Sequence, residues 1–274
     1  MMLLLNTYCS ALVAIVVVAL TVSCGSWFDT HPYDVHFHGV TGINDRQIKT
    51  IEERFAEKDT LRIAFISDTH GWYSDMTDEI ADLNNQRDID FVVHCGDLTD
   101  TGTSKEYEWA RHLLERLDYP YVALIGNHDF LGTGDQAYQV MFGRLDFSFI
   151  VSHIKFVCLN TNATEYDYMA AVPNFDFMEE EMARDTARFN RTVLVMHAPP
   201  YSDQFNNNVC KAFRRYLDLF PGLMCCVYGH NHNHIVDDIY DDGLLFYGID
   251  CAEHRNYSIM TITPDSYEME QIYY

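Results

Sequence analysis

The sequence predicts a layered α/β sandwich, and two features of its 274 residues carry that prediction. Short apolar runs of strand length, rich in Val, Ile, Phe and Tyr, alternate with stretches whose apolar residues recur at helical spacing. Alternation of strand, helix and strand in the first half is typical of a parallel or mixed sheet with helices on both sides. Because 48% of the residues are hydrophobic and the chain has no repeat or Pro/Gly/Ser-rich linker, we expect one globular domain.

The expected strands are short enough to be buried on both faces. They are the apolar runs at residues 62–67, 90–95, 121–125, 147–160, 192–197, 223–229 and 244–249. The C-terminal stretch alternates around Pro264 and Asp265, which predicts an antiparallel hairpin. Helices are expected at residues 76–86, 104–117, 175–189 and 209–220, with Ser104 as the N-cap of the second.

The N-terminus has the pattern of an export signal. Residues 11–20 form an uncharged apolar run, and small residues and Cys24 follow it. This arrangement resembles a lipoprotein leader, so we expect a signal peptide at 1–23, export, and membrane attachment through lipidated Cys24 at the cell surface or in the periplasm. A simple signal peptide and an uncleaved anchor starting near Leu3 are the alternatives. The rest of the chain is expected to divide into an N-terminal segment at 24–59 and the main domain at 60–274.

The six cysteines that follow the leader do not form a recognisable disulfide or zinc pattern. Cys95, Cys158, Cys225 and Cys226 lie in apolar runs, which indicates small buried hydrophobic side chains. Cys225 and Cys226 are adjacent, so in a strand they would face opposite sides of the sheet.

The formal net charge of −23 excludes one class of partner. Such a surface repels phosphate backbones, so a nucleic-acid polymer is not expected to bind. A small phosphorylated substrate is compatible with the chain if a local group reverses the field.

Five of the apolar runs end in side chains that can bind metal. The residues are Asp68 and His70, then Asp97, then Asn127 and His128, then His197, then His230 and His232. Open α/β sheets bind ligands beyond the carboxyl ends of their strands, so these side chains are expected to converge. An extended backbone would direct residues two apart, such as Asp68 and His70, to the same side.

The chemistry of this set favours borderline divalent ions. Apart from His128, two carboxylates, four imidazoles and one amide give mixed nitrogen and oxygen ligands, which suit Zn, Fe or Mn better than calcium. Seven such ligands exceed what one tetrahedral ion needs, so two ions that share Asp97 are the economical interpretation.

The ordered motifs D-x-H, G-D, G-N-H-D, H and G-H-x-H over residues 60–260 resemble the calcineurin-like metallophosphoesterase family. The stretches "GDLTDTG" and "MHAPP" are most similar to the branch of cyclic-nucleotide and glycerophosphodiester phosphodiesterases. The resemblance implies an αββα-type sandwich of mixed sheets with a dinuclear metal site at the C-terminal ends of strands. It also implies one metal bound by Asp68, His70, Asp97 and His232, and a second bound by Asp97, Asn127, His197 and His230.

The implied reaction is hydrolysis of a phosphodiester, ahead of a phosphomonoester, by a hydroxide that two metal ions activate. His128 falls at the family's catalytic histidine, and Asp129 is expected to orient it. Loops around the centre are expected to set specificity, with Trp72, Tyr201, His254 and Arg255 as candidates. Alternatives are a hydrolase of lipid- or wall-linked phosphates or pyrophosphates, and a metal-bound scaffold without catalysis. The His-rich stretch 31–38 has no counterpart in the motif set.

Overall fold

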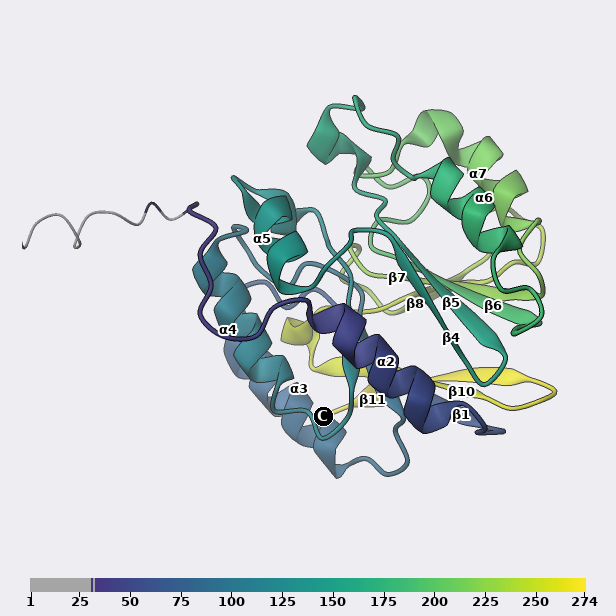
Figure 1. The fold of residues 1–274 in the computed structure, drawn as a ribbon, viewed down its shortest axis with the longest axis horizontal. Coiled ribbons are helices and arrows are strands. Elements are labelled where there is room, and N and C mark those ends of the chain that lie inside the picture. Colours follow the sequence, from purple (N-terminus) through teal and green to yellow (C-terminus); the bar gives the residue numbers. More distant parts are fainter. Residues whose placement is uncertain (1–30, 32) are drawn as a thin grey trace, which may run out of the picture.

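Two sheets pack face to face in the computed structural model, which describes residues 31 and 33–274 (Figure 1). The first sheet has the order β11-β10-β1-β2-β3. Strands β1, β2 and β3 are parallel, whereas β10 is antiparallel to β1 and to β11. The strands are β1 (Leu61–Ile66), β2 (Phe91–His94), β3 (Tyr121–Ala123), β10 (Asn256–Ile262) and β11 (Tyr267–Tyr273). The predicted C-terminal hairpin is therefore confirmed.

The second sheet has the order β4-β5-β6-β7-β9-β8, and it is also mixed. Its central strands β5, β6, β7 and β9 are parallel, with β4 and β8 antiparallel at the two edges. The strands are β4 (Phe147–Val151), β5 (Ile154–Leu159), β6 (Arg191–Met196), β7 (Leu223–Tyr228), β8 (Ile235–Asp237) and β9 (Phe246–Gly248). Parallel central strands place their carboxyl ends at one edge of the sheet.

The main hydrophobic core lies between the two sheets. The ring of Phe91 on β2 meets the rings of Phe149 and Phe156 from the other sheet, at centroid distances of 5.8 and 5.4 Å. Phe149 and Phe156 stack on each other at 5.0 Å. Such aromatic contacts add to the burial energy of the interface and fix how the sheets face each other.

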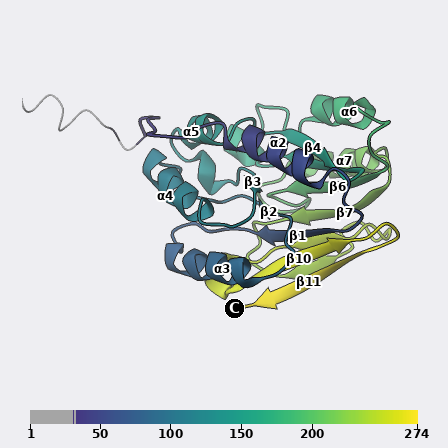
Figure 2. The same cartoon turned by 60° about the horizontal axis from the view of Figure 1, so that its bottom comes forward.

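Helices cover the outer faces of both sheets (Figures 1 and 2). Side chains from α3 (Tyr73–Asn85), α4 (Ser104–Leu114) and α5 (Gly134–Met141) form a second core with β1–β3. Helices α6 (Phe175–Ala183) and α7 (Cys210–Leu217) form a third core with β5–β7. The predicted layered αββα sandwich is confirmed. The N-cap of α4 is Thr103, one residue before the predicted Ser104, because Thr103 completes a capping box with Glu106.

Helix α2 (Ile43–Phe55) was not predicted from the sequence. The buried Asn44 side chain bridges it to β3, donating to the carbonyl of Ala123 at 2.8 Å and accepting from its N–H at 3.0 Å. Ile51 enters the core between the sheets. The helix is therefore attached to the sandwich by a polar contact that apolar periodicity does not reveal.

Helix α6 ends at Ala183, six residues before the predicted end. The ammonium group of Lys155 on β5 donates to the carbonyls of Glu181 and Arg184 at 2.6 and 3.1 Å. These bonds satisfy carbonyls at the end of the helix, where no further turn is available to do so. Asp185 then adopts a left-handed conformation with φ of 60° and turns the chain away.

The six cysteines from Cys95 onward are free and buried, which confirms the prediction of burial made for Cys95, Cys158, Cys225 and Cys226. Cys225 faces the core between the sheets and Cys226 faces the helices, so the two thiols lie on opposite faces of β7. The predicted signal peptide at 1–23 and the predicted lipidation site Cys24 lie outside the described residues. Within residues 31 and 33–274, the structure contains no helix with the length and apolar character that crossing a membrane requires.

Candidate metal centre

The seven predicted ligands lie together at the edge where the parallel strands of both sheets end. Loops after β1, β2 and β3 of the first sheet contribute four of them, and loops after β6 and β7 of the second sheet contribute three. Within the described residues, ligating atoms of these side chains form close groups of three in which every atom lies within 4.8 Å of the others. The predicted convergence at strand ends is therefore confirmed.

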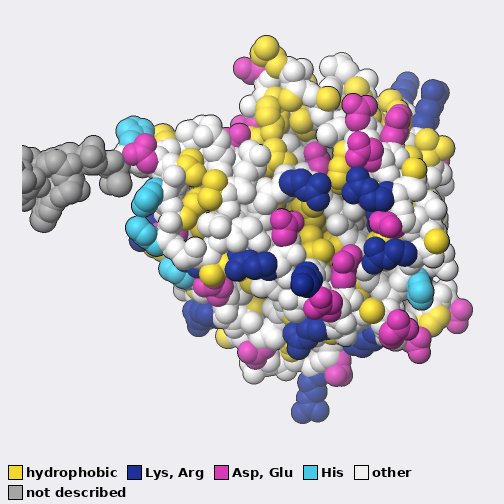
Figure 3. Space-filling model, in the orientation of Figure 1, with side chains coloured by type: hydrophobic (Ala, Val, Ile, Leu, Met, Phe, Trp, Pro, Cys, Tyr) yellow, Lys and Arg dark blue, Asp and Glu magenta, His cyan; other side chains and the backbone are white. Residues whose placement is uncertain are grey.

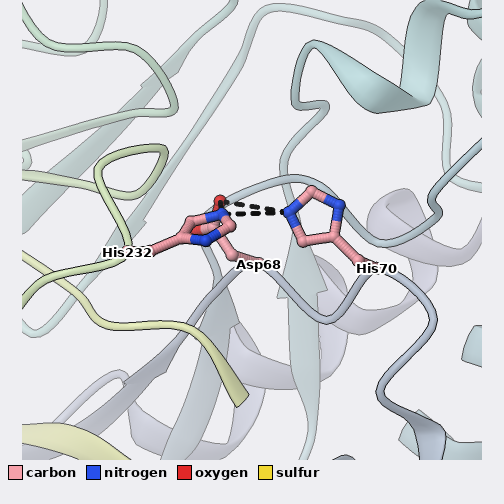
Figure 4. Close-up of side chains that lie close together, drawn as sticks. All are labelled: Asp68, His70 and His232. Carbon is pink, nitrogen blue, oxygen red and sulfur yellow. Dashed lines mark hydrogen bonds and ion pairs between the residues drawn. The ribbon is translucent and has the colours of Figure 1, made fainter. Parts of the chain in front are cut away.

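One group consists of Asp68 and His70 from the loop after β1 and His232 from the loop after β7, and the three side chains point to the same place (Figure 4). The Nε2 atoms of His70 and His232 are 3.0 Å apart. Asp68 Oδ1 lies 3.2 Å from Nε2 of His232 and 3.8 Å from Nε2 of His70. A fully buried carboxylate that faces two imidazole nitrogens offers a mixed oxygen and nitrogen site for a borderline cation.

A second group surrounds the amide oxygen of Asn127. This oxygen lies 3.1 Å from Nε2 of His197 and 3.0 Å from Nδ1 of His230. His197 donates from Nδ1 toward the carbonyl of Cys95 at 2.9 Å, which leaves its Nε2 lone pair directed at the group.

Asp97 lies between the two groups. Its Oδ2 is 3.5 Å from Nε2 of His70 and 3.3 Å from Nε2 of His197. Its other oxygen accepts from the backbone N–H of His128 at 2.8 Å. The carboxylate therefore faces both groups with one oxygen and is held in place through the other, which is the position expected of a shared ligand.

The backbone at five of the seven positions is left-handed. This corrects the expectation that an extended chain directs Asp68 and His70 to the same side. The φ values are 50° at Asp68, 45° at His70, 54° at Asp97, 68° at His230 and 46° at His232. Non-glycine residues in this region cost on the order of 1 kcal/mol each, and such strain clusters at functional sites.

Glycines allow the loops to approach this closely. A Cβ atom added to Gly96 would lie 2.5 Å from Nδ1 of His197, and one added to Gly229 would lie 2.7 Å from Oδ2 of Asp68. Both positions therefore require the absence of a side chain.

The two buried carboxylates of the centre attract positive charge. Burial disfavours the charged form of His197, but the adjacent Asp97 carboxylate raises the pKa of this imidazole to about 9. A hydrogen bond to Asp68, followed in strength by one to Cys251, raises the pKa of His232 to about 10. Two buried carboxylates thus require positive charge beside them, and divalent cations would supply it in place of the protons.

His128 lies at the accessible side of this centre. Its ring packs edge-on against the ring of His70 at 4.5 Å, and its side chain is 40% exposed, whereas that of Asp68 is fully buried. Its Nδ1 lies 3.0 Å from the carbonyl oxygen of Asp100 and 3.6 Å from the Asp100 carboxylate. Asp100 thus fixes the ring. Sequence reasoning missed this residue, and its only indication in the sequence is that it lies three residues after Asp97.

Asp129 does not contact the His128 imidazole, so the predicted orienting contact is wrong. Its buried carboxylate accepts from the N–H groups of Leu98, Thr99 and Gly126 at 3.1, 2.9 and 2.9 Å. The hydroxyl of Thr99 donates to it as well, at 2.8 Å. The Asp129 side chain therefore joins the loops that carry Asp97 and Asn127, and it acts on the centre by holding the backbone of those loops.

Comparison with known proteins agrees with this geometry. A family model described as calcineurin-like phosphoesterase matches residues 61–234, more than half of the chain. The chain belongs to the calcineurin-like phosphoesterase family. Members are hydrolases that act on phosphoester bonds and generally use a dinuclear divalent metal site. The seven side chains fit such a site because they provide two groups of oxygen and nitrogen ligands with Asp97 between them.

Two curated relatives have phosphodiesterase names. The chain is 27% identical over 153 residues to a 3′,5′-cyclic-nucleotide phosphodiesterase of Nostoc sp., over 53% of this chain and 56% of that protein. It is 26% identical over 214 residues to the glycerophosphodiester phosphodiesterase GpdQ of Enterobacter lignolyticus, over 63% and 71%. A dimetal phosphatase from Danio rerio has a similar fold, with a TM-score of 0.62 at 12% identity, covering 77% of this chain and 95% of that one.

The four residues predicted to set specificity lie at different positions relative to the metal centre. The Trp72 ring lies 5.3 Å from the His70 ring and 5.7 Å from the His232 ring, so it borders the centre. Tyr201 is 55% exposed on the loop after β6. Arg255 is directed at α3, where it pairs with Asp75 and Asp78 at 3.3 and 2.9 Å. Nδ1 of His254 donates to the carboxylate of Asp250 at 2.7 Å. Arg255 therefore has carboxylate partners that compete with a phosphate.

His94 is a further buried residue beneath the centre that the sequence did not single out. Burial lowers its pKa to about 3, so its ring is neutral. Its Nδ1 accepts from the N–H of Gly96 at 3.3 Å, and its Nε2 therefore donates to the hydroxyl of Thr69 at 2.8 Å. The ring joins the loops after β1 and β2. The remaining His-rich stretch runs beside α4, where the N–H of His38 donates to Glu108 at 3.3 Å.

Proposed function

We propose that this chain is a phosphodiesterase that uses two divalent ions, with Mn, Fe or Zn as the candidate metals. The observation that carries the proposal is Asp97, whose Oδ2 faces His70 on one side and His197 on the other. One carboxylate between two ligand groups is the arrangement that a two-ion clamp on an in-line displacement requires. The preference for diesters rests on the names of the Nostoc and Enterobacter relatives.

The proposed ligand sets are those expected from the motifs. Asp68, His70, Asp97 and His232 would hold one ion, and Asp97, Asn127, His197 and His230 would hold the other. When bound, these ions would supply Lewis acidity that lowers the pKa of water and offsets charge on the phosphate oxygens. Two bound dications against the carboxylates of Asp68 and Asp97 would leave a locally positive centre in an acidic protein.

His128 is the proposed proton donor to the leaving oxygen. Its Nδ1 faces Asp100, so its Nε2 is free to face a substrate on the exposed side of the centre. Because Nδ1–H is directed at the Asp100 carbonyl, donation from Nε2 requires the imidazolium form of His128, whose Nε2 proton would neutralise the alkoxide as the ester bond breaks. This placement argues against a metal-bound scaffold, because a scaffold needs the buried ligands and not an exposed imidazole beside them.

The proposed substrate is a small phosphate diester. On the face that Figure 3 shows, Lys and Arg side chains are interspersed with Asp and Glu and do not gather into a basic stripe. A nucleic-acid polymer would require such a stripe. We also propose that residues 1–23 export the chain and that Cys24 anchors it, which would place lipid- or wall-linked phosphates within its reach as alternative substrates.

The test compares the purified protein loaded separately with Mn, Zn and Fe. Rates on bis-p-nitrophenyl phosphate and p-nitrophenyl phosphate are measured, and bound metal is counted in the same samples. We expect faster turnover of the diester with about two ions per chain, and loss of turnover in Asp97→Ala. Two bound ions without turnover on these esters or on a panel of lipid- and wall-linked phosphates would overturn the proposal.

A further inference from the structure

A carboxylate outside the predicted ligand set touches the centre. Asp203 lies on the loop after β6, and its Oδ1 is 2.8 Å from Nε2 of His230. The side chain of Asp203 is otherwise 84% exposed. An exposed Asp contributes little to packing, so any function of Asp203 must come from its contact with His230.

The two nitrogens of His230 face different partners. Nε2 faces Asp203, while Nδ1 faces the amide oxygen of Asn127 at 3.0 Å. A neutral imidazole carries one proton, and a carboxylate beside Nε2 holds that proton there. The lone pair of Nδ1 is then directed at the oxygen of Asn127. Two acceptors that face each other in this way are the arrangement expected around a shared cation.

Hydrogen bonds hold the loop that carries Asp203. The carbonyl of Gln204 accepts from the N–H of Ala163 at 2.9 Å. The side chain of Asn207 accepts from the N–H of Tyr201 at 2.9 Å and donates to the carbonyl of Ser202 at 2.8 Å. Asp203 is therefore presented to His230 by an ordered loop, and the exposed ring of Tyr201 lies two residues away in the same loop.

We propose that Asp203 is a positioning residue that fixes the Nδ1 lone pair of His230 for the second metal ion. Through this bond the loop 201–208 is coupled to occupancy of that metal position. The proposal rests on the proposed ligand role of His230. Outer-sphere partners of ligating histidines typically change metal affinity by about 10- to 100-fold, so the effect is measurable without substrate.

The test measures Mn²⁺ binding to the metal-free protein by isothermal titration calorimetry. We expect Asp203→Leu, which removes the acceptor, to weaken the second binding event by about 10- to 100-fold and to leave the first unchanged. Asp203→Asn keeps an oxygen that accepts from Nε2, so its affinity should lie between those of Leu and wild type. The matched control is Asp59→Asn, an exposed residue before β1 at the opposite end of the strands.

Two results would overturn the proposal. Equal second-site affinity in wild type and Asp203→Leu would show that Asp203 does not position His230. An Asn variant as weak as the Leu variant would indicate direct ligation by the carboxylate in place of positioning.

Hydrogen exchange supplies the second readout. Mn²⁺ should slow exchange at the backbone amides of residues 201–208 in wild type and in Asp59→Asn, and should not do so in Asp203→Leu. Unchanged slowing in the Leu variant would contradict the coupling. Because neither readout uses a substrate, a protein that shows both effects but hydrolyses no ester would refute the proposed function alone.

Discussion

The buried Asp129 carboxylate accepts a hydrogen bond from the N–H of Gly126 at 2.9 Å, three residues earlier in the chain. The same carboxylate reaches Leu98 and Thr99 in the loop after β2. Two loops that carry Asp97 and Asn127 are thus joined by one side chain, and the position of both ligands depends on it.

Asp129→Ala should therefore destabilise the protein strongly. It leaves four donor groups without their acceptor, and each unsatisfied buried group costs about 1–3 kcal/mol, so we expect a loss of at least about 3 kcal/mol. Urea unfolding of the metal-free protein measures this loss. Asp129→Asn retains one acceptor oxygen and should lose less, whereas a loss below about 1 kcal/mol in the Ala variant would show that the loops are held by other contacts.

Gly229→Ala should disrupt the centre because there is no room for the added methyl group. The added Cβ would overlap Oγ of Ser67 and lie 2.7 Å from Oδ2 of Asp68, so the carboxylate must move. We expect weaker metal binding and a stability loss of about 1–3 kcal/mol. Gly71→Ala is the control, because a Cβ there meets no heavy atom within 4 Å. Equal metal affinity in both variants would contradict the crowding argument.

Single ligand substitutions should distinguish the two metal positions. His232→Ala is expected to remove one ion and His197→Ala the other, because each imidazole belongs to one group. Asp97→Ala should weaken both positions, by more than the roughly 100-fold that outer partners contribute. Metal analysis after dialysis against a graded chelator gives the count. An Asp97→Ala protein that keeps two ions as tightly as wild type would rule out the shared position.

His128→Ala should slow hydrolysis according to the leaving group. Loss of a proton donor typically costs about 10²- to 10⁴-fold, and alkoxides need that proton more than p-nitrophenolate does. We therefore expect a larger loss on an alkyl phosphodiester than on bis-p-nitrophenyl phosphate, with unchanged metal content. Equal losses on both substrates would indicate that His128 stabilises charge and does not transfer a proton.

Glu79 should make stability depend on pH. It is buried on α3, and its Oε2 has no hydrogen-bond partner within the described part of the chain. Burial, with a smaller contribution from Asp75, raises its pKa well above the ordinary 4.5. The folded state thus keeps this proton to higher pH than the unfolded chain does, so stability is fullest below pH 4.5 and falls as the pH rises toward the raised pKa.

Glu79→Gln should remove that pH dependence. We expect the variant to gain stability over wild type at pH 8 relative to pH 5, by on the order of 1–3 kcal/mol, because no buried charge forms. Thermal unfolding at the two pH values measures the difference. A wild-type protein that becomes more stable from pH 5 to pH 8 relative to Glu79→Gln would contradict the sign.

The sequence was sufficient where the information is local. Apolar runs identify strands, and the residues that end them identified the side chains that meet at the centre. It did not reveal Asp100 or Asp203, because their contacts with His128 and His230 depend on how separate loops fold back. The four donors around Asp129 depend on the same folding. Helix α2 was missed since only Ile43, Asn44 and Ile51 are buried along it, and one of these is polar.

The division of the ligands between two sheets has a consequence for assembly. The first sheet supplies Asp68, His70, Asp97 and Asn127, and the second supplies His197, His230 and His232. Neither half of the sandwich contains a complete set, so ions would bind only after the halves have docked. Bound metal would then link the two sheets. At a free metal concentration one hundred times the dissociation constant, it would stabilise the folded state by about 2.7 kcal/mol and raise the unfolding temperature. Removal of the metal by a chelator would therefore weaken the association of the two sheets as well as abolish hydrolysis.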